Sequence, residues 1–167
     1  MRGPAAVYEA LAALGIEFAG TEHQPVFTIE EMAALVFPPD VMVAKNLFLR
    51  DAKGRRHFLV VLAKDRPADL RALEKTLDCS RLSFASAERL EKHLKLTKGS
   101  VSPLGLVNDP DNAVEAVVDQ SLSRHARIGV HPNDNSATLF LRYEDMLKII
   151  SANGRRVHFI YSVLNNY

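Results

Sequence analysis

Residues 41–63 read VMVAKNLFLRDAKGRRHFLVVLA, and this stretch decides the fold class of the chain. Its two ends, Val41–Arg50 and His57–Ala63, have the composition of β-strands. Asp51-Ala52-Lys53-Gly54 between them has the composition of a turn, so the stretch predicts a β-hairpin. Helical patterns and further strand patterns surround this hairpin. They favour a mixed α/β fold, with helices packed outside a mixed sheet, over a doubly wound parallel sheet.

The other expected elements follow from hydrophobic periodicity and capping residues on both sides of the hairpin. Before it we expect a helix from Pro4 to Gly15, with Val7, Leu11 and Leu14 on its apolar face, and then a strand at Ile16–Ala19. A second helix is expected to begin at the capping box Thr28–Glu31, to carry Met32, Leu35 and Val36, and to end at Phe37. After it we expect two helices, capped by Asp69 and Ser86, and a last helix that Asp145 opens and Asn153-Gly154 ends. A loop at Lys98–Asp109 is expected to lead into a strand at Leu104–Val107. Further strands are expected at Ala113–Val118, Ala126–His131, Ala137–Leu141 and Val157–Val163. No repeat and no long linker divides the chain, so residues 1–167 are expected to form one domain.

Length and composition exclude several classes of protein. A chain of 167 residues with 47% apolar and 25% charged residues suits a globular domain and not a disordered or fibrous one. Its one cysteine, Cys79, excludes an internal disulfide, and we expect a structural place for it near a helix end. No signal peptide and no uncharged run long enough to span a membrane are visible, so we expect a cytoplasmic protein with no membrane partner.

The net charge of +1 conceals an uneven distribution of charge along the chain. Residues 45–98 carry fourteen Lys and Arg against seven Asp and Glu, whereas residues 1–44 and 99–167 are net acidic. The basic middle third fits two structures, a patch that faces phosphates or a set of solvated helix and hairpin faces.

Common catalytic and metal-binding signatures are absent from the sequence. There is no Gly-rich dinucleotide or P-loop motif and no Gly-x-Ser-x-Gly elbow. The six histidines have no ligand spacing with one another or with the cysteine, so no metal and no other cofactor is expected.

Three places nevertheless suggest chemistry. Lys45-Asn46 lies inside an apolar strand, where a lysine must reach solvent or meet an anion because burying it unpaired is costly. The loop Gly99-Ser100-Val101-Ser102-Pro103 can expose backbone N–H groups to an oxyanion, although most such loops are only turns. His131 ends a strand that Pro132 blocks, a position that fits a packed histidine as well as a functional one.

Together these segments resemble the prolyl-tRNA editing superfamily, also called the YbaK or ProX family. The resemblance rests on five motifs in family order: Glu22–Thr28, Lys45–Asp51, Leu82–Ser86, Gly99–Asp109 and His131–Thr138. The branch that the chain is most similar to is the PrdX or ProXp-ala type, which hydrolyses alanine mischarged on proline tRNA.

The resemblance implies a fold, a reaction and a set of site residues. The fold is a mixed α/β domain with a central, partly barrel-like sheet. The reaction is deacylation of mischarged tRNA, most of all Ala-tRNA(Pro), by substrate-assisted ester hydrolysis. The implied catalytic group is Lys45 with Asn46, the loop residues Gly99, Ser100, Val101, Ser102 and Pro103, and His131, with Ser102 not a nucleophile. The implied amino-acid pocket is lined by Val26, Phe27, Val43 and His131.

The implied partner is the acceptor end of mischarged tRNA(Pro), with prolyl-tRNA synthetase as a further candidate. Phosphate contacts are expected from Lys45, Arg50, Arg55, Arg56, Lys64 and Arg66. The pair Val43-Ala44 departs from the polar pair that many alanine-specific members carry before the lysine, which leaves the preferred amino acid open. A deacylase for Cys-, Ser- or Thr-tRNA, a non-catalytic nucleic-acid-binding module and a small-molecule hydrolase therefore stay as alternatives, and the oligomeric state stays open.

Overall fold

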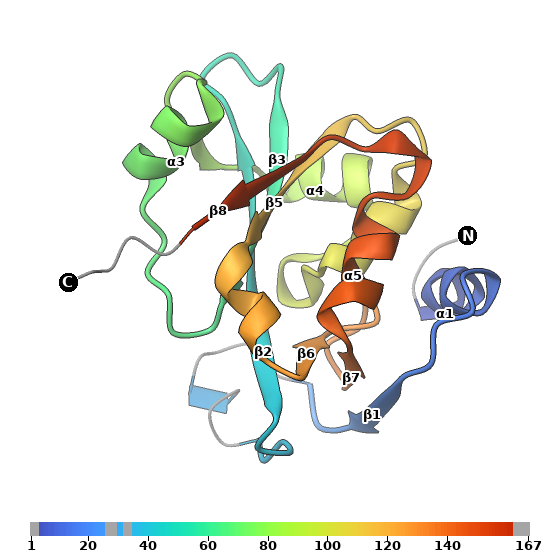
Figure 1. Ribbon diagram of the computed structural model, residues 1–167. Helices are drawn as coiled ribbons and strands as arrows, with labels where there is room; N and C mark the ends of the chain where they lie inside the picture. The colour runs from blue at the N-terminus through green and yellow to red at the C-terminus, as the bar shows by residue number, and fades with distance from the viewer. Residues whose placement is uncertain (1–3, 26–29, 32–34, 162–167) are drawn as a thin grey trace.

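One twisted mixed sheet organises the protein, and the computed structural model describes it over residues 4–25, 30–31 and 35–161 (Figure 1). The described α-helices are α1 (Pro4–Ala13), α3 (Leu70–Leu77), α4 (Ala87–Leu94) and α5 (Tyr143–Ile150). The strands are β1 (Ala19–Glu22), β2 (Val41–Arg50), β3 (His57–Ala63), β4 (Ser83–Phe84), β5 (Val114–Asp119), β6 (Arg127–Val130), β7 (Ala137–Leu141) and β8 (Val157–Ile160). Short 3₁₀ helices are η1 (Lys98–Ser100), η2 (Pro103–Asn108), η3 (Gln120–Arg124) and η4 (Ala152–Gly154).

The strands lie in the order β1-β7-β6-β2-β3-β5-β8, and β4 pairs with β2 off this path. The long strand β2 joins the two halves of the sheet because it has different partners along its length. Val41–Val43 pair in parallel with β6, and Ala44–Arg50 pair antiparallel with β3. In Figure 1 this strand runs the height of the molecule, with α5 and α4 on one side and α3 near its far end.

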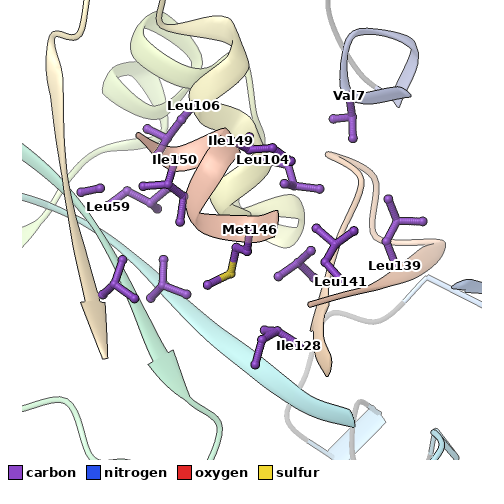
Figure 2. Close-up of a cluster of buried hydrophobic side chains, with 14 of the residues drawn as sticks. Val7, Leu59, Leu104, Leu106, Ile128, Leu139, Leu141, Met146, Ile149 and Ile150 are labelled. Carbon is purple, nitrogen blue, oxygen red and sulfur yellow. The ribbon is translucent and has the colours of Figure 1, made fainter. Parts of the chain in front are cut away.

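Strand β3 is buried along its whole length because both faces of the sheet are covered there. Leu59, Val61 and Ala63 face the main core beneath α1, α4, α5 and η2, part of which is drawn in Figure 2. Phe58, Val60 and Leu62 alternate with them and face a second core beneath α3. A fully buried strand in the middle of the sheet explains why the run HFLVVLA is apolar at nearly every position.

The structure confirms the expectations that rest on local signals. The hairpin strands have the expected bounds, and Gly54 takes the positive φ of 67° that its turn requires. Asp69 and Ser86 cap α3 and α4 by accepting hydrogen bonds from the N–H groups of Ala72 and Arg89. The mixed sheet with helices outside it is also as expected.

The expectations that need tertiary information are wrong at several places. The first strand is Ala19–Glu22 and not Ile16–Ala19, because it pairs with β7, which begins far away at Ala137. Leu104–Val107 is part of the 3₁₀ helix η2, because Pro103 opens a helical turn and the Ser102 hydroxyl accepts from the Leu104 N–H at 3.1 Å.

Smaller corrections concern the ends of helices and strands. The last helix begins at Tyr143, one turn before the expected position, so Asp145 lies inside it and Arg142 is its N-cap. Leu14 lies beyond α1 and is exposed, while Leu35 and Val36 are outside any helix and Val36 is 93% exposed. Thr28, Met32 and Val163 lie outside the described residues, and β8 ends at Ile160.

A buried guanidinium holds η2 against the sheet and α5. The Arg155 side chain donates to the Asp109 carboxylate at 2.6 Å and to the carbonyls of Leu106, Asp109, Val114 and Ile150 at 2.8–3.1 Å. Asp109 in turn accepts from the N–H groups of Ala113 and Val114. Every interaction of this planar group is made in a nearly solvent-free site, since the side chain of Arg155 is 2% exposed.

Replacing Arg155 by lysine keeps the charge but cannot reproduce this set of five hydrogen bonds. We expect Arg155→Lys to lower the free energy of unfolding by about 3 kcal/mol, because it leaves buried carbonyls and a carboxylate without donors. Urea unfolding monitored by circular dichroism measures the loss. The adjacent Arg156→Lys is the control and should cost less than about 0.5 kcal/mol, since Arg156 is exposed and 4.0 Å from Glu115. Equal losses in the two variants would contradict the role given to Arg155.

Candidate active site

The site lies at a fork in the sheet, where β2 leaves β6. The last register pair of these two strands is Val43 with Gly129. From Ala44 onward β2 pairs only with β3 until it reaches β4 at Leu49. Lys45 and His131 each follow two residues after the last pair, so they lie on the two sides of the opening. Strand ends that diverge in this way leave a concave place for a ligand.

The loop Gly99–Pro103 fills one side of this fork. The Asn46 amide nitrogen donates to the carbonyl of Val101 at 3.4 Å, and the Ser102 hydroxyl donates to the carbonyl of His131 at 2.6 Å. The loop is thereby held between β2 and the end of β6. The structure therefore brings together Asn46, the loop and His131, which lie far apart in the sequence.

The loop itself is two helical turns joined by an extended dipeptide. Gly99 and Ser100 belong to η1, Pro103 begins η2, and Val101 and Ser102 between them are extended. Among the residues that the structure describes, the backbone N–H groups of Val101 and Ser102 have no acceptor. Successive N–H groups of an extended chain point in opposite directions, so one of these two, and not both, can face a single oxyanion.

Ser102 is committed to the scaffold of the loop. Its hydroxyl donates to the His131 carbonyl and accepts from the Leu104 N–H, and the residue is fully buried. Asn133, two residues after His131, adds a contact at 3.5 Å from its amide nitrogen to the carbonyl of Leu104. The hydroxyl of Ser102 is therefore a clamp between the loop and β6.

Two buried amide oxygens flank the loop without a partner in the described part of the chain. They are Oδ1 of Asn46 and Oδ1 of Asn133. Buried polar atoms are nearly always paired, and an exception calls for an explanation. Asn46 Oδ1 is such an exception, and it lies beside the loop.

Lys45 and Asn46 point to opposite faces of β2 because side chains alternate along a strand. Asn46 shares its face with Phe48 of the main core, whereas Lys45 shares its face with Leu47 and Leu49. The half-buried ammonium of Lys45 donates to the carbonyl of Arg66. An ammonium has three donors, and the other two have no acceptor among the described residues.

One ring nitrogen of His131 is unprotonated. Its Nδ1 lies 3.0 Å from the carbonyl of Ala137, which can only accept, so Nδ1 carries the proton. Burial lowers the pKa of His131 against the opposing effect of this hydrogen bond, so the ring is neutral near pH 7. Nε2 therefore keeps its lone pair.

A second histidine, His23, lies beside His131, and no role was predicted for it from the sequence. The rings of His23 and His131 meet edge to face with centroids 6.4 Å apart. His23 Nδ1 donates to the carbonyl of Gln24, and Nε2 is hydrogen-bonded to the hydroxyl of Thr138 at 2.9 Å. Phe37 also contacts His23, with ring centroids 6.4 Å apart.

His23 and Thr138 stand in two of the quoted motifs, but only the pairing of β1 with β7 places them together. The expected pocket residues are placed in part. Val43 and His131 lie at the fork, while Val26 and Phe27 lie outside the described residues.

The structure splits the expected phosphate-binding cations into two groups. Lys64 and Arg66 follow β3 at the Lys45 end of the hairpin, where the Lys64 N–H donates to the Val43 carbonyl. Arg50, Arg55 and Arg56 lie at the opposite end, about 17 Å along β2 from Lys45. The hairpin therefore cannot gather all five around Lys45.

Most of these cations already have partners. Arg56 pairs with Glu115 at 2.9 Å, Arg66 pairs with the fully buried Asp119 at 2.7 Å, and Arg50 donates to the carbonyls of Asp51 and Ala52. Of the expected phosphate-binding cations, only Lys64 and Arg55 have no side-chain partner within the described segments, and both are exposed.

The pKa of Asp119 shows that its pairing with Arg66 is structural. Burial works to raise that pKa, but hydrogen bonds from the Ala63 N–H and from Ser121, with the charge of Arg66, hold it below the ordinary value. Asp119 is thus ionised and keeps Arg66 in place. The same arrangement fixes the carbonyl of Arg66, which accepts the hydrogen bond from Lys45.

The described residues form neither a metal site nor a membrane span. No group of three or more His, Cys, Asp or Glu is placed to hold a metal ion. None of the described helices combines the length and the apolar character needed to cross a bilayer.

Comparison with known proteins shows what the chain is similar to. The family model described as "Aminoacyl-tRNA editing domain" matches residues 23–149. The chain is 52% identical over 149 residues to the prolyl-tRNA editing protein ProX of Acetoanaerobium sticklandii, which covers 89% of this chain and 91% of that protein.

Solved structures agree on the fold. The crystal structure of a hypothetical protein superposes with a TM-score of 0.72 at 22% identity, over 92% of this chain and 97% of that one. A candidate trans-editing enzyme for prolyl tRNA synthetase superposes with a TM-score of 0.69 at 18% identity, over 93% and 94% of the two chains.

The clamp made by Ser102 is open to a direct test. We expect Ser102→Ala to lower the free energy of unfolding by about 1–3 kcal/mol, because a buried carbonyl and a buried N–H lose their partner. Ser123→Ala is the matched control, since its hydroxyl also donates to a carbonyl, at 2.8 Å, but on the surface. Denaturant unfolding of both variants measures the difference, and a loss below about 0.5 kcal/mol for Ser102→Ala would rule out the clamp.

Proposed function

The chain belongs to the aminoacyl-tRNA editing domain family, and on this premise we propose that it hydrolyses the ester of alanine mischarged on proline tRNA. The observation that carries the proposal is the fork, where the loop Gly99–Pro103 is tied to Asn46 on one side and to His131 on the other. That arrangement brings the loop with its open backbone donors to the opening in the sheet, between Asn46 on β2 and His131 at the end of β6. The 52% identity to a prolyl-tRNA editing protein supports the choice of substrate.

Hydrolysis of an aminoacyl ester requires few catalytic groups from the protein. An aminoacyl ester is already activated, so its hydrolysis needs a positioned water and stabilisation of the oxyanion more than a strong nucleophile. Water adds to the ester carbonyl, the bond to the ribose oxygen breaks, and that oxygen takes up a proton to become a hydroxyl again. The products are alanine and uncharged tRNA.

Each side chain at the fork has a role in this reaction. The N–H of Val101 or Ser102 donates to the developing oxyanion, and Lys45 anchors a phosphate or the ester carbonyl as a point charge. Nε2 of His131 accepts a hydrogen bond from the amino group or from a ribose hydroxyl, and Asn46 positions the loop through the carbonyl of Val101. A ribose hydroxyl of the terminal adenosine helps to activate the water, so the site needs no general base of its own.

Editing is required because the synthetic site of a synthetase cannot strongly reject a smaller amino acid. One methylene of difference is worth only about 1–3 kcal/mol. A second pocket that admits alanine and is too small for proline supplies the missing discrimination. Val43 and His131 are the described walls of that pocket, and Val26 and Phe27 complete the proposed set.

The wider setting of the site is part of the proposal. Residues 1–167 act as one editing domain in the cytoplasm, which the unbroken strand order from β1 to β8 and the single cysteine support. The acceptor end of the tRNA contacts Lys45 and Lys64. Arg50, Arg55 and Arg56 lie at the other end of the hairpin, and Arg66 is paired with the buried Asp119. Prolyl-tRNA synthetase is the proposed protein partner.

The role of Lys45 can be tested with a panel of mischarged tRNAs. We expect Lys45→Ala to slow deacylation of alanyl-tRNA(Pro) about 100-fold, the size expected when one charged stabilising group is lost. Lys75→Ala, an exposed lysine of α3, is the control and should retain full activity. Prolyl-tRNA(Pro) should stay intact with every variant.

The outcome of the same panel separates the alternatives. Release of cysteine, serine or threonine in place of alanine would keep the site and change the substrate. Tight binding of tRNA without release of any amino acid would make the protein a binding module.

The salt dependence of tRNA binding tests the electrostatic part of the proposal. Each phosphate contact contributes about 0.7–0.9 to the slope of log K against log salt. We therefore expect Lys64→Ala to weaken binding and to reduce this slope by about that amount. Arg124→Ala, an exposed cation outside the basic middle third, should change neither quantity. An unchanged slope for Lys64→Ala would move the tRNA to another surface.

A further inference from the structure

His23 binds the two residues on either side of Ala137. It follows directly after β1, and its backbone N–H donates to the carbonyl of Ser136 at 2.9 Å. Its Nε2 is hydrogen-bonded to the hydroxyl of Thr138, also at 2.9 Å. Ala137 lies between these two residues, and its carbonyl accepts the hydrogen bond from Nδ1 of His131. His23 is thereby tied to both neighbours of the carbonyl that orients the His131 ring.

The start of β7 depends on β1 for its position. The ladder between β6 and β7 stops at the pair of Val130 with Leu139, so the carbonyl of Ala137 lies beyond it. The pairing of β1 with β7 continues to Glu22 with Ala137, and the N–H of His23 extends it by one residue (Figure 1). His23 is therefore placed where β1 and the start of β7 are held together.

Both ring nitrogens of His23 have partners within the protein. Nδ1 lies 2.9 Å from the carbonyl of Gln24, and Nε2 is paired with the hydroxyl of Thr138. Thr138 is 2% exposed, and a buried hydroxyl without a partner is costly, so this hydrogen bond belongs to the scaffold. Since neither nitrogen of His23 is left for a substrate, an effect of His23 on the reaction must pass through a neighbour.

The neighbour that can transmit such an effect is His131. The two rings meet edge to face with centroids 6.4 Å apart, and His23 is tied to the residues that flank the Ala137 carbonyl. A carbonyl only accepts, so it selects the tautomer of His131 that carries the proton on Nδ1. If the carbonyl moved away, the neutral ring could carry its proton on Nε2, and Nε2 would then no longer accept a hydrogen bond.

We propose that His23 is a positioning residue for His131. Through Ser136 and Thr138 it holds the Ala137 carbonyl in place, and this keeps His131 in the tautomer whose Nε2 accepts a hydrogen bond from the aminoacyl substrate. The role toward the substrate rests on the proposed function, whereas the tautomer is a property of the free protein.

Long-range proton–nitrogen NMR of the histidine rings measures this tautomer without any substrate. We expect His131 of the wild type to carry its proton on Nδ1. Thr138→Val keeps the shape of the side chain but removes the hydroxyl, and His23→Phe keeps a ring but removes its hydrogen bonds, so both should shift His131 toward the form protonated on Nε2. Thr21→Val is the matched control and should cause no shift, because Thr21 lies opposite Thr138 on β1 and is exposed. Thermal unfolding checks that each variant is folded.

Deacylation of alanyl-tRNA(Pro) tests the role toward the substrate. We expect kcat/KM to fall about tenfold in His23→Phe and in Thr138→Val, which is the effect of losing one hydrogen bond to the substrate. His23→Gln should stay within about threefold of wild type, because its amide can pair with the Thr138 hydroxyl whichever of the two donates. In a His131→Ala background, Thr138→Val should cause no further loss, since the residue through which it acts is gone.

Three results would overturn the proposal. A His131 tautomer that is the same in every variant would mean that the Ala137 carbonyl does not depend on His23. Full activity in His23→Phe together with a loss in His23→Gln would make His23 a packing residue. Additive losses in the His131→Ala background would give Thr138 a role of its own. If wild-type protein released no alanine, the proposed function would fail, while the NMR measurement would still decide whether His23 sets the tautomer.

Discussion

The change of partner along β2 is the constraint on which the rest of the structure depends. β2 lies between β6 and β3, and its edge toward β6 is paired with that strand only up to Val43, whereas its other edge is paired with β3 from Ala44 to Arg50. The sheet must therefore open at this point. The opening would leave polar backbone groups exposed, and the loop Gly99–Pro103 fills it through contacts with Asn46 and His131. The opening that the loop fills is thus also the place that can bind a ligand.

The position of the loop is fixed because buried side chains tie it to rigid elements of the fold. Ser102 ties it to the end of β6, and Arg155 with Asp109 ties the following 3₁₀ helix to β5 and α5. All three side chains are buried, so their hydrogen bonds have little competition from water. A site that relies on backbone donors needs such support, because displacement by about 1 Å weakens the stabilisation of a transition state.

Several of the arginines are committed to ion pairs within the fold. Arg56, Arg66 and Arg155 each form an ion pair with a carboxylate that is largely or fully buried, so they belong to the scaffold. Within the part of the chain that the structure describes, two donors of the Lys45 ammonium have no acceptor, and the exposed Lys64 lies nearby. The sparse chemistry of the site fits an activated ester, for which the substrate brings most of the reactivity and the protein supplies position.

The sequence by itself determined what short-range chemistry controls, and the family followed from five motifs in order. The hairpin at 41–63 and the caps at Asp69 and Ser86 are local features, since a turn or a cap depends on residues only a few positions apart. Lys45, Asn46, the loop and His131 could be singled out, but not their arrangement. Only the tertiary structure decided that Lys45 and Asn46 lie on opposite faces of β2, that the hairpin separates Lys64 from Arg55, and that His23 and Thr138 meet. Each of these depends on which strands pair and in what register, and strand pairing is set by burial across the whole chain and not by any single segment.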